Sequence, residues 1–192
     1  MSLRYVILSL LSVEPNTGYG IGRVLRGELS HVWEARLQQI YTELAKLEAE
    51  GALAVEELAL PKRPAKKLYR LTPEGEAALT SWLSSKLSRP SARDDLLVRL
   101  SRLGRLEIEA AVRLLEERSE EATTQIVALQ RRLPGSTPIT LDELGRLMTL
   151  EAALARADAE VAWCSRALDR LRAIERGGAG FAGDGERLTS NA

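Results

Sequence analysis

The first fifty residues repeat apolar side chains every three or four positions. This spacing gathers apolar side chains on one face of a helix, and it predicts three successive helices, over residues 2–13, 18–29 and 36–50. Glu14-Pro15-Asn16 predicts a turn between the first two, and Thr17 or Asn16 can cap the second. Gly51 follows the third helix, at the position where a glycine commonly ends one.

The spacing of apolar residues changes after Gly51. Residues 53–58 alternate weakly and predict a strand, residues 60–66 contain two prolines and predict a loop, and residues 67–71 predict a second strand. Together these segments predict a β-hairpin. Thr72-Pro73-Glu74 then places an N-cap, a proline at the first helical position and an acid in the first turn, which predicts a helix over 73–87.

The remainder of the chain has a helical pattern. Ser88–Ala92 is polar and contains a proline, and it is the best internal boundary. Beyond it, apolar residues at helical spacing predict helices over 94–103, 107–132 and 141–175, with a turn at 133–140. The glycine-rich, polar end predicts disorder. The predicted organisation is therefore a first domain over 1–88, a helical domain over 93–176 and a disordered tail over 177–192.

The order of the predicted elements indicates a fold class. Three helices, a hairpin and a fourth helix within the first domain match a winged helix-turn-helix, in which the third helix lies in the DNA major groove and the hairpin wing reaches the flanking backbone. We therefore predict a mainly α protein with a small β-hairpin: an N-terminal winged helix-turn-helix followed by a C-terminal α-helical dimerisation domain.

Polar residues that suit DNA occupy both predicted contact elements. The third helix should bury Leu37, Ile40, Leu44 and Leu47, which leaves an outward face with side chains that read base edges or neutralise phosphate. The hairpin adds four positive charges. The predicted DNA-binding residues are Arg36, Gln38, Gln39, Thr42 and Lys46 on the helix, and Lys62, Arg63, Lys66 and Lys67 on the wing. The alternative is a solvated amphipathic helix beside a charged turn.

Composition and charge indicate which kind of ligand the chain binds and in which compartment it works. The formal net charge of the 192-residue chain is +0, so its basic run between residues 62 and 70 indicates a polyanion bound at one place. No apolar run reaches the about 18 residues of a membrane span, and the N-terminus lacks a signal-peptide cleavage pattern. A single cysteine, Cys164, excludes an intramolecular disulfide and fits a reducing compartment, so we expect a cytoplasmic protein.

The sequence offers no constellation for catalysis, so we do not expect an enzyme, a metal site or a cofactor. His31 is the only histidine, Cys164 lies far from it in the sequence, and neither belongs to a nucleophile or zinc motif. A rival function is a winged-helix adaptor that binds proteins rather than DNA, which acids near the third helix, Glu34, Glu43 and Glu48, would allow. A salt-dependent interaction with duplex DNA separates the two functions.

Several motifs resemble one family of regulators. They are the opening Leu3-Arg4-Tyr5-Val6-Ile7-Leu8-Ser9-Leu10-Leu11, Thr17-Gly18-Tyr19-Gly20-Ile21, the segment from Gln39 to Gly51 and the segment from Leu68 to Gly75. In these residues the chain resembles the PadR family of transcriptional regulators, closely over 3–83. Its longer C-terminal half resembles the larger subfamily in architecture only.

The resemblance implies a cytoplasmic homodimer that binds a pseudo-palindromic operator, usually as a repressor, and is released from it by a small aromatic or hydrophobic effector. It also implies that Tyr19 and Tyr41 approach the phosphate backbone, although core packing with the hydroxyl at the surface is an equal interpretation. The C-terminal helices would dimerise, which agrees with their excess of apolar residues, since two helices from one chain leave an apolar stripe open.

An effector site requires an apolar pocket with a few polar groups. Such pockets often lie at a domain or subunit junction, which Trp82, at the end of the first predicted domain, and Trp163, in the last predicted helix, are placed to line. Nearby arginines could bind a carboxylate. The predicted effector residues are Trp82, Trp163, Arg99, Arg102 and Arg166. The alternative, that both tryptophans only fill cores, is the favoured one.

Overall fold

The computed structural model describes residues 3–60, 63–87, 94–135 and 137–176. The predicted boundary at 88–92, the predicted tail at 177–192 and Lys62 lie outside the described residues. Residues 1–90 and 91–192 form two compact units.

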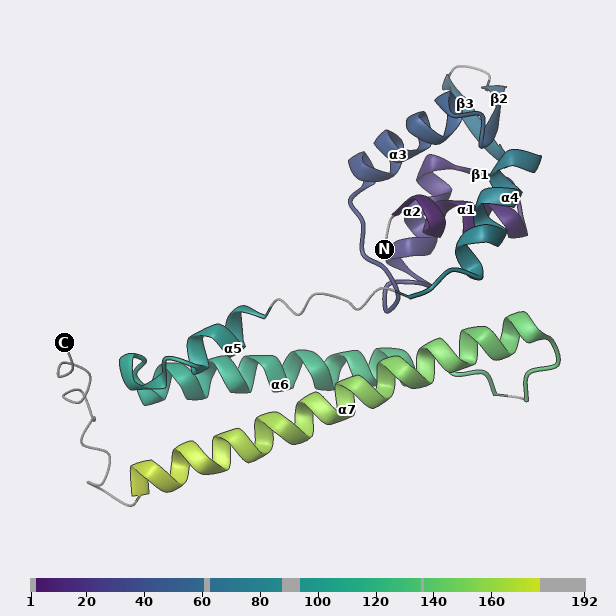
Figure 1. Ribbon diagram of the computed structural model, residues 1–192. Coiled ribbons are helices and arrows are strands. Elements are labelled where there is room, and N and C mark those ends of the chain that lie inside the picture. Colours follow the sequence, from purple (N-terminus) through teal and green to yellow (C-terminus); the bar gives the residue numbers. More distant parts are fainter. Residues whose placement is uncertain (1–2, 61–62, 88–93, 136, 177–192) are drawn as a thin grey trace, which may run out of the picture. The chain divides into compact units, whose positions relative to one another are not determined.

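The first unit has the element order of a winged helix (Figure 1). Its β3 pairs antiparallel with β2 on one side and with the two-residue β1 on the other. The predicted fold class, mainly α with a small hairpin, is confirmed. The elements are α1 (Leu3–Val13), β1 (Asn16–Thr17), α2 (Gly18–Arg26), α3 (Leu37–Ala49), β2 (Leu53–Leu60), β3 (Arg63–Leu71) and α4 (Pro73–Leu83).

Capping contacts and one left-handed glycine account for the observed ends of the predicted helices. Thr17 caps α2 by accepting a hydrogen bond from the Gly20 backbone N–H. Thr72 caps α4 in the same way, and its hydroxyl also donates to the Gly51 carbonyl oxygen at 2.8 Å. Gly51 has a φ of 76°, a left-handed conformation that favours glycine and ends α3.

The hairpin differs from its prediction. Residues 60–66 were expected to form a loop because they contain two prolines, yet β2 includes Leu60 and β3 begins at Arg63. The register shifts between Leu58 and Leu60, where β3 has one residue more than β2. Pro64 lies within that irregular stretch, and a bulge tolerates a residue that cannot donate a backbone hydrogen bond. The wing is therefore longer than predicted.

Two other boundaries were wrong, and one segment was incompletely predicted. Thr17 caps α2 as predicted, but Asn16–Thr17 also forms a short strand that pairs with Leu68 and Tyr69 of β3. The second helix ends at Arg26 instead of residue 29, because Gly27 leaves the helical conformation. The helix after the hairpin ends at Leu83 instead of residue 87, and the hydroxyls of Ser84 and Ser85 donate to carbonyl oxygens of its last turn.

A core of leucine and isoleucine fixes α3 in the first unit. Ile40, Leu44 and Leu47 are fully buried, and they pack with apolar residues of α1 and α2. At the edge of this core, the ring of Trp82 stacks on that of Tyr5, with 4.8 Å between ring centroids and 5° between ring planes. One face of α3 is thereby buried, so the other is presented to solvent.

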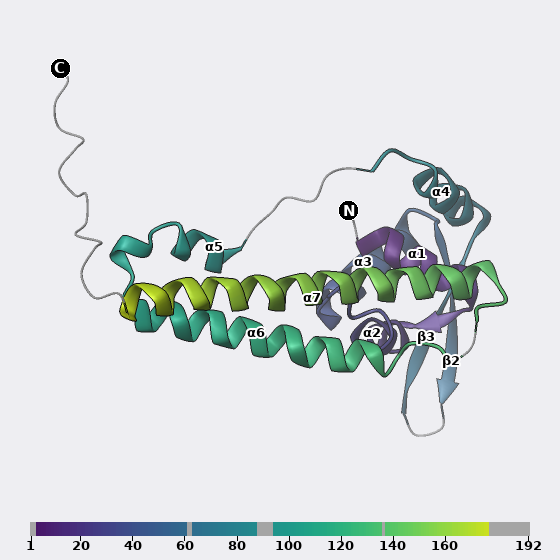
Figure 2. The ribbon, with the colours of Figure 1, turned by 90° about the horizontal axis from the view of Figure 1, so that it is seen from below.

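The second unit is helical. It contains α5 (Asp95–Leu100), a 3-10 turn (Leu103–Arg105), α6 (Ile108–Gln130) and α7 (Leu141–Arg176). Both long helices were predicted, whereas the predicted helix 94–103 is split into α5 and the 3-10 turn. Figure 2 shows α6 and α7 side by side, and between them Leu115 and Cys164 are buried. None of the described helices is long and apolar enough to cross a membrane.

A polar cluster ties α5 to the two long helices. Arg118 of α6 donates to the Asp94 carboxylate at 2.8 Å and to the Glu160 carboxylate of α7 at 3.1 Å. The same Asp94 oxygen accepts the backbone N–H groups of Leu96 and Leu97 and so caps α5. The Arg118 hydrogen bond, helped by these backbone donors, lowers the pKa of the Asp94 carboxyl from its usual value.

This lowered pKa predicts a pH dependence of stability. Because the folded state favours the ionised carboxylate, Asp94 stabilises the unit above its unfolded pKa near 3.8, and that contribution disappears as the pH falls through the lower folded value. In urea titrations followed by circular dichroism, Asp94→Asn should lower the unfolding midpoint at pH 7 and change it less and less as the pH falls below 3.8. Asp95→Asn, one residue along, removes a carboxylate that does not accept the Arg118 hydrogen bonds, so it is the matched control and should change the midpoint less at pH 7.

Candidate nucleic-acid interface

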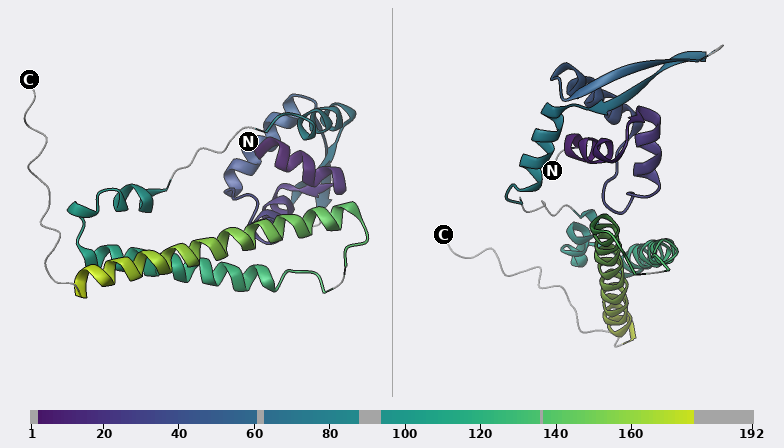
Figure 3. Two further views of the ribbon diagram at one scale, coloured as in Figure 1. Left: turned by 60° about the horizontal axis from the view of Figure 1, so that its bottom comes forward. Right: turned by 90° about the vertical axis from the view of Figure 1, so that its right-hand side faces the viewer.

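The polar face predicted for the third helix is exposed on α3. Gln38, Gln39, Thr42 and Lys46 all lie opposite the buried Ile40, Leu44 and Leu47, and Arg36 precedes the helix as its N-cap. Figure 3 shows the β2–β3 hairpin extending from the body of the first unit. A solvent-facing helix beside a projecting hairpin is the arrangement that lets one unit contact a groove and the adjoining backbone.

The exposed side chains differ in the hydrogen bonds left for DNA. The Gln39 side-chain oxygen accepts the backbone N–H of Arg36 at 2.9 Å, so Gln39 has its amide donors left for a base. The Thr42 hydroxyl donates to the Gln38 carbonyl oxygen at 2.9 Å, so it offers DNA an acceptor and a methyl group. A bidentate contact to adenine requires both an acceptor and a donor. Gln38 fits that requirement better than Gln39.

We therefore expect Gln38→Ala to change sequence preference more cleanly than Gln39→Ala. Losing a bidentate base contact costs about 1–3 kcal/mol of discrimination. Gln39→Ala also removes the hydrogen bond at the start of α3, and it should lower the thermal midpoint as well, at a cost of about 1 kcal/mol. Competition binding on duplexes with single base changes, combined with thermal melts, checks both. Equal discrimination by the wild-type and Gln38→Ala chains would contradict the assignment.

Two tyrosines flank the start of the candidate interface. Tyr19 on α2 is 62% exposed and Tyr41 on α3 is 42% exposed. The Tyr41 ring lies directly against Gly18, where a Cβ atom would overlap it, so a larger residue at position 18 would force the ring to move. The exposure favours a surface role for both tyrosines over core packing, and their contact with phosphate stays a prediction.

The predicted wing residues are distributed along the hairpin rather than gathered in a tip loop. Lys66 and Lys67 lie within β3 and are exposed, and Arg63 is the first residue of that strand. The Lys67 ammonium lies 3.3 Å from a carboxylate oxygen of Glu48 on α3. The sequence identifies Glu48 only as an acid near the third helix. Glu48 follows Tyr41 by seven residues, or two helical turns, so the spacing alone could have placed both side chains on one flank of α3.

The predicted effector residues are divided between the two units, with Trp82 in the first and the other four in the second. Trp82 packs within the core of the first unit, against Tyr5. Trp163 is half-buried in the second unit, beside the cluster that contains Leu96 and Cys164. Both tryptophans thus contribute to cores, which is the alternative favoured from the sequence. The three arginines, which are Arg99, Arg102 and Arg166, are exposed.

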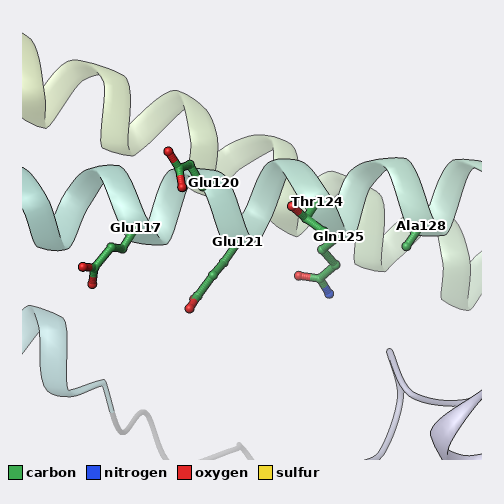
Figure 4. A pocket seen from close by; sticks show the side chains of 6 residues that line it. All are labelled: Glu117, Glu120, Glu121, Thr124, Gln125 and Ala128. Atoms are coloured by element: carbon green, nitrogen blue, oxygen red, sulfur yellow. The ribbon is translucent and has the colours of Figure 1, made fainter.

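A hollow on α6 is unlike an effector pocket. Figure 4 shows six side chains along one side of that helix, and three of them are carboxylates. A site for a flat apolar ligand is lined mainly by apolar and aromatic residues, whereas Ala128 is the one apolar residue that lines this hollow. Among the described residues, no group of three or more metal-binding side chains could hold a metal ion. The hollow is lined by Glu117, Glu120, Glu121, Thr124, Gln125 and Ala128.

Comparisons with known proteins match both units. The model of the transcriptional regulator PadR-like family matches residues 7–81, and that of the virulence activator alpha C-terminal domain matches residues 92–172. The chain is 27% identical over 168 residues to the negative transcriptional regulator PadR of Bacillus subtilis, which covers 84% of this chain and 92% of that protein.

Solved structures show the same fold. The B. subtilis PadR structure in complex with operator DNA matches with a TM-score of 0.78 and 26% identity, covering 88% of this chain and 98% of that one. The structure of the same protein in complex with p-coumaric acid matches with a TM-score of 0.74 and 28% identity over the same shares of the two chains. Both matches extend over the two units, so the similarity is not confined to the winged helix.

Proposed function

The chain belongs to the PadR-like family of transcriptional regulators, and we propose that it is a cytoplasmic repressor that binds a pseudo-palindromic operator as a homodimer. The observation that supports this most directly is the exposed polar face of α3, held in place by the buried residues opposite it, with the β2–β3 hairpin beside it. B. subtilis PadR, which has this fold, is known in complex with operator DNA.

The helical unit has an apolar surface suited to a second copy. Leu141, Leu144 and Met148 recur at helical spacing on α7 and are 85%, 40% and 59% exposed. Such an exposed apolar stripe favours coverage by a partner, and a two-fold axis covers the same stripe on both copies. A dimer would set two α3 helices about 34 Å apart, or a multiple of it, to match successive turns of DNA.

Selection of bound fragments from the protein's own genome tests the function. The wild-type chain should enrich fragments that share a pseudo-palindrome, and its affinity for them should fall steeply as salt rises. Sedimentation at micromolar concentration should give twice the 21.1 kDa mass of one chain. A chain that shows no salt-dependent binding to any duplex, yet retains its fold, would instead favour the protein-interaction adaptor.

We also propose that a small aromatic carboxylate releases the protein from its operator, since B. subtilis PadR is known in complex with p-coumaric acid. Such a ligand must bind the operator-incompatible conformation more tightly, because equal affinity for both conformations shifts nothing. In the second unit, the half-buried Trp163 would supply stacking surface, and Arg99, Arg102 or Arg166 would bind the carboxylate. Titration with phenolic acids, followed by tryptophan fluorescence and operator release, tests this. Binding that leaves DNA affinity unchanged would contradict it.

A further inference from the structure

One cation of the candidate interface is already paired with an acid that lies beside the DNA-facing surface. The Lys67 ammonium is within 3.4 Å of both carboxylate oxygens of Glu48, although 19 residues separate them in the sequence. Tyr41 lies on the same flank of α3 as Glu48, two helical turns earlier. Glu48 and Lys67 are 36% and 48% exposed, so the pair is open to solvent and to a bound polyanion.

Strand register explains why Lys67 reaches α3. Side chains alternate between the two faces of a strand, so Lys67 and Tyr69 of β3 share one face. Tyr69 is buried in the core beneath α3, which identifies this face as the inner one. Burial raises the pKa of the Tyr69 hydroxyl, Lys67 counteracts that rise, and Glu48 and Tyr41 add to it. The four groups therefore meet where the wing joins α3.

A second ion pair lies on the opposite face of the same sheet. Arg70 of β3 donates to Glu56 of β2 at 3.2 Å, and both side chains are about half exposed. Arg70 is offset by one residue from Tyr69, so this pair faces away from α3. The Arg70–Glu56 pair has the same charges as the Lys67–Glu48 pair and nearly the same nitrogen-to-oxygen distance. It can therefore serve as a control on the face of the sheet turned away from α3.

An exposed ion pair contributes little to stability, so Glu48 is not required to hold the fold together. A phosphate that approached Lys67 would have to displace the Glu48 carboxylate, which would remain nearby and repel phosphates over about 10 Å at 0.1 M salt. Binding without sequence preference depends almost entirely on phosphate contacts, so each cation that is already neutralised lowers it. An operator complex adds base contacts, which fix the register of α3 on the DNA. Affinity for the operator therefore depends less on whether Lys67 contacts a phosphate.

We propose that Glu48 is a specificity-determining residue of the proposed DNA-binding function: by holding Lys67 beside α3, it suppresses binding to DNA that lacks the operator. The ligand it excludes is the phosphate backbone of duplex DNA. In the wild-type chain Lys67 stays paired with Glu48 in both kinds of complex, and only when Glu48 is removed does a freed Lys67 gain a phosphate contact in complexes without sequence preference.

Binding of the full chain to two duplexes tests this inference. One is a mixed-sequence duplex and the other an operator selected from the genome. Glu48→Gln should raise affinity for the mixed-sequence duplex by up to about eightfold at 0.1 M salt, and steepen its salt slope by about 0.9, as one added phosphate contact predicts. Affinity for the operator should rise less than twofold, so the ratio of the two affinities falls.

Two further variants separate this role from a structural one. Glu56→Gln gives the same change in charge on the far face of the sheet, and it should leave both affinities within twofold of wild type. Glu48→Asp keeps the carboxylate and should restore the wild-type ratio. A purely structural Glu48 would instead give a lower thermal midpoint and weaker binding to both duplexes in Glu48→Gln.

The outcomes that overturn the inference are distinct from failure of the proposed function. An unchanged ratio in Glu48→Gln, or the same change in Glu56→Gln, overturns the role of Glu48 while DNA binding stands. A wild-type chain that binds neither duplex overturns the proposed function, and this inference with it.

Discussion

Replacing Lys62, Arg63 and Lys66 together by alanine is expected to weaken DNA binding by up to about 500-fold at 0.1 M salt. Each cation that contacts one phosphate contributes about 0.9 to the salt slope, so the slope should fall by as much as about 2.7. The loss should be nearly equal for operator and mixed-sequence duplexes, because phosphate contacts convey no sequence information. Fluorescence anisotropy over a range of salt concentrations measures both quantities.

The matched control removes the same charge from the helical unit. Arg131, Arg146 and Arg156 are exposed on or beside its two long helices, and their replacement by alanine should leave the slope unchanged. Adding Lys67→Ala to the wing variant should lower the affinity much less than the first three changes do, since Glu48 already neutralises that ammonium. A wing variant with wild-type affinity would remove the hairpin from the interface.

The element order of the fold could be predicted because its signals are local. Helical spacing placed α1, α3, α6 and α7 to within a few residues, and Thr72-Pro73 placed the start of α4. The two-residue β1 could not be predicted, because two residues show no periodicity and the strand exists only through its pairing with Leu68 and Tyr69. The length of the wing was underestimated for a similar reason, since a bulge accommodates Pro64 and only the register reveals it.

The candidate site, too, could be predicted from the sequence only in part. The outward face of α3 followed from which of its residues are apolar, so its members could be named from the sequence. Their chemical state could not, because it depends on contacts made after folding. The Gln39 oxygen is engaged at the start of the helix, and Lys67 is paired with Glu48 from another element. These contacts change which side chains can read a base and which cations are available to phosphate.

Leu44→Ala should unfold the first unit at a markedly lower temperature. The side chain is fully buried in the core that holds α3 against α1 and α2. Truncating a buried leucine to alanine costs about 2–5 kcal/mol, from lost burial and the cavity left behind. For a unit of this size each kcal/mol lowers the thermal midpoint by about 4–8 °C, so the expected shift is at least about 8 °C. Thermal melts in a Trp163→Phe background would follow Trp33 and Trp82, which belong to this unit.

Leu115→Ala is the matched change in the second unit, where that leucine is 1% exposed. The two cores have no residue in common, so each substitution should destabilise its own unit first. In the Trp163→Phe background, Leu115→Ala should therefore leave the midpoint of the transition reported by Trp33 and Trp82 fluorescence unchanged. The helical signal in circular dichroism should be lost at a lower temperature. Equal shifts of the tryptophan signal by both variants would mean that the two units unfold as one, and that α3 depends on the helical unit for its stability.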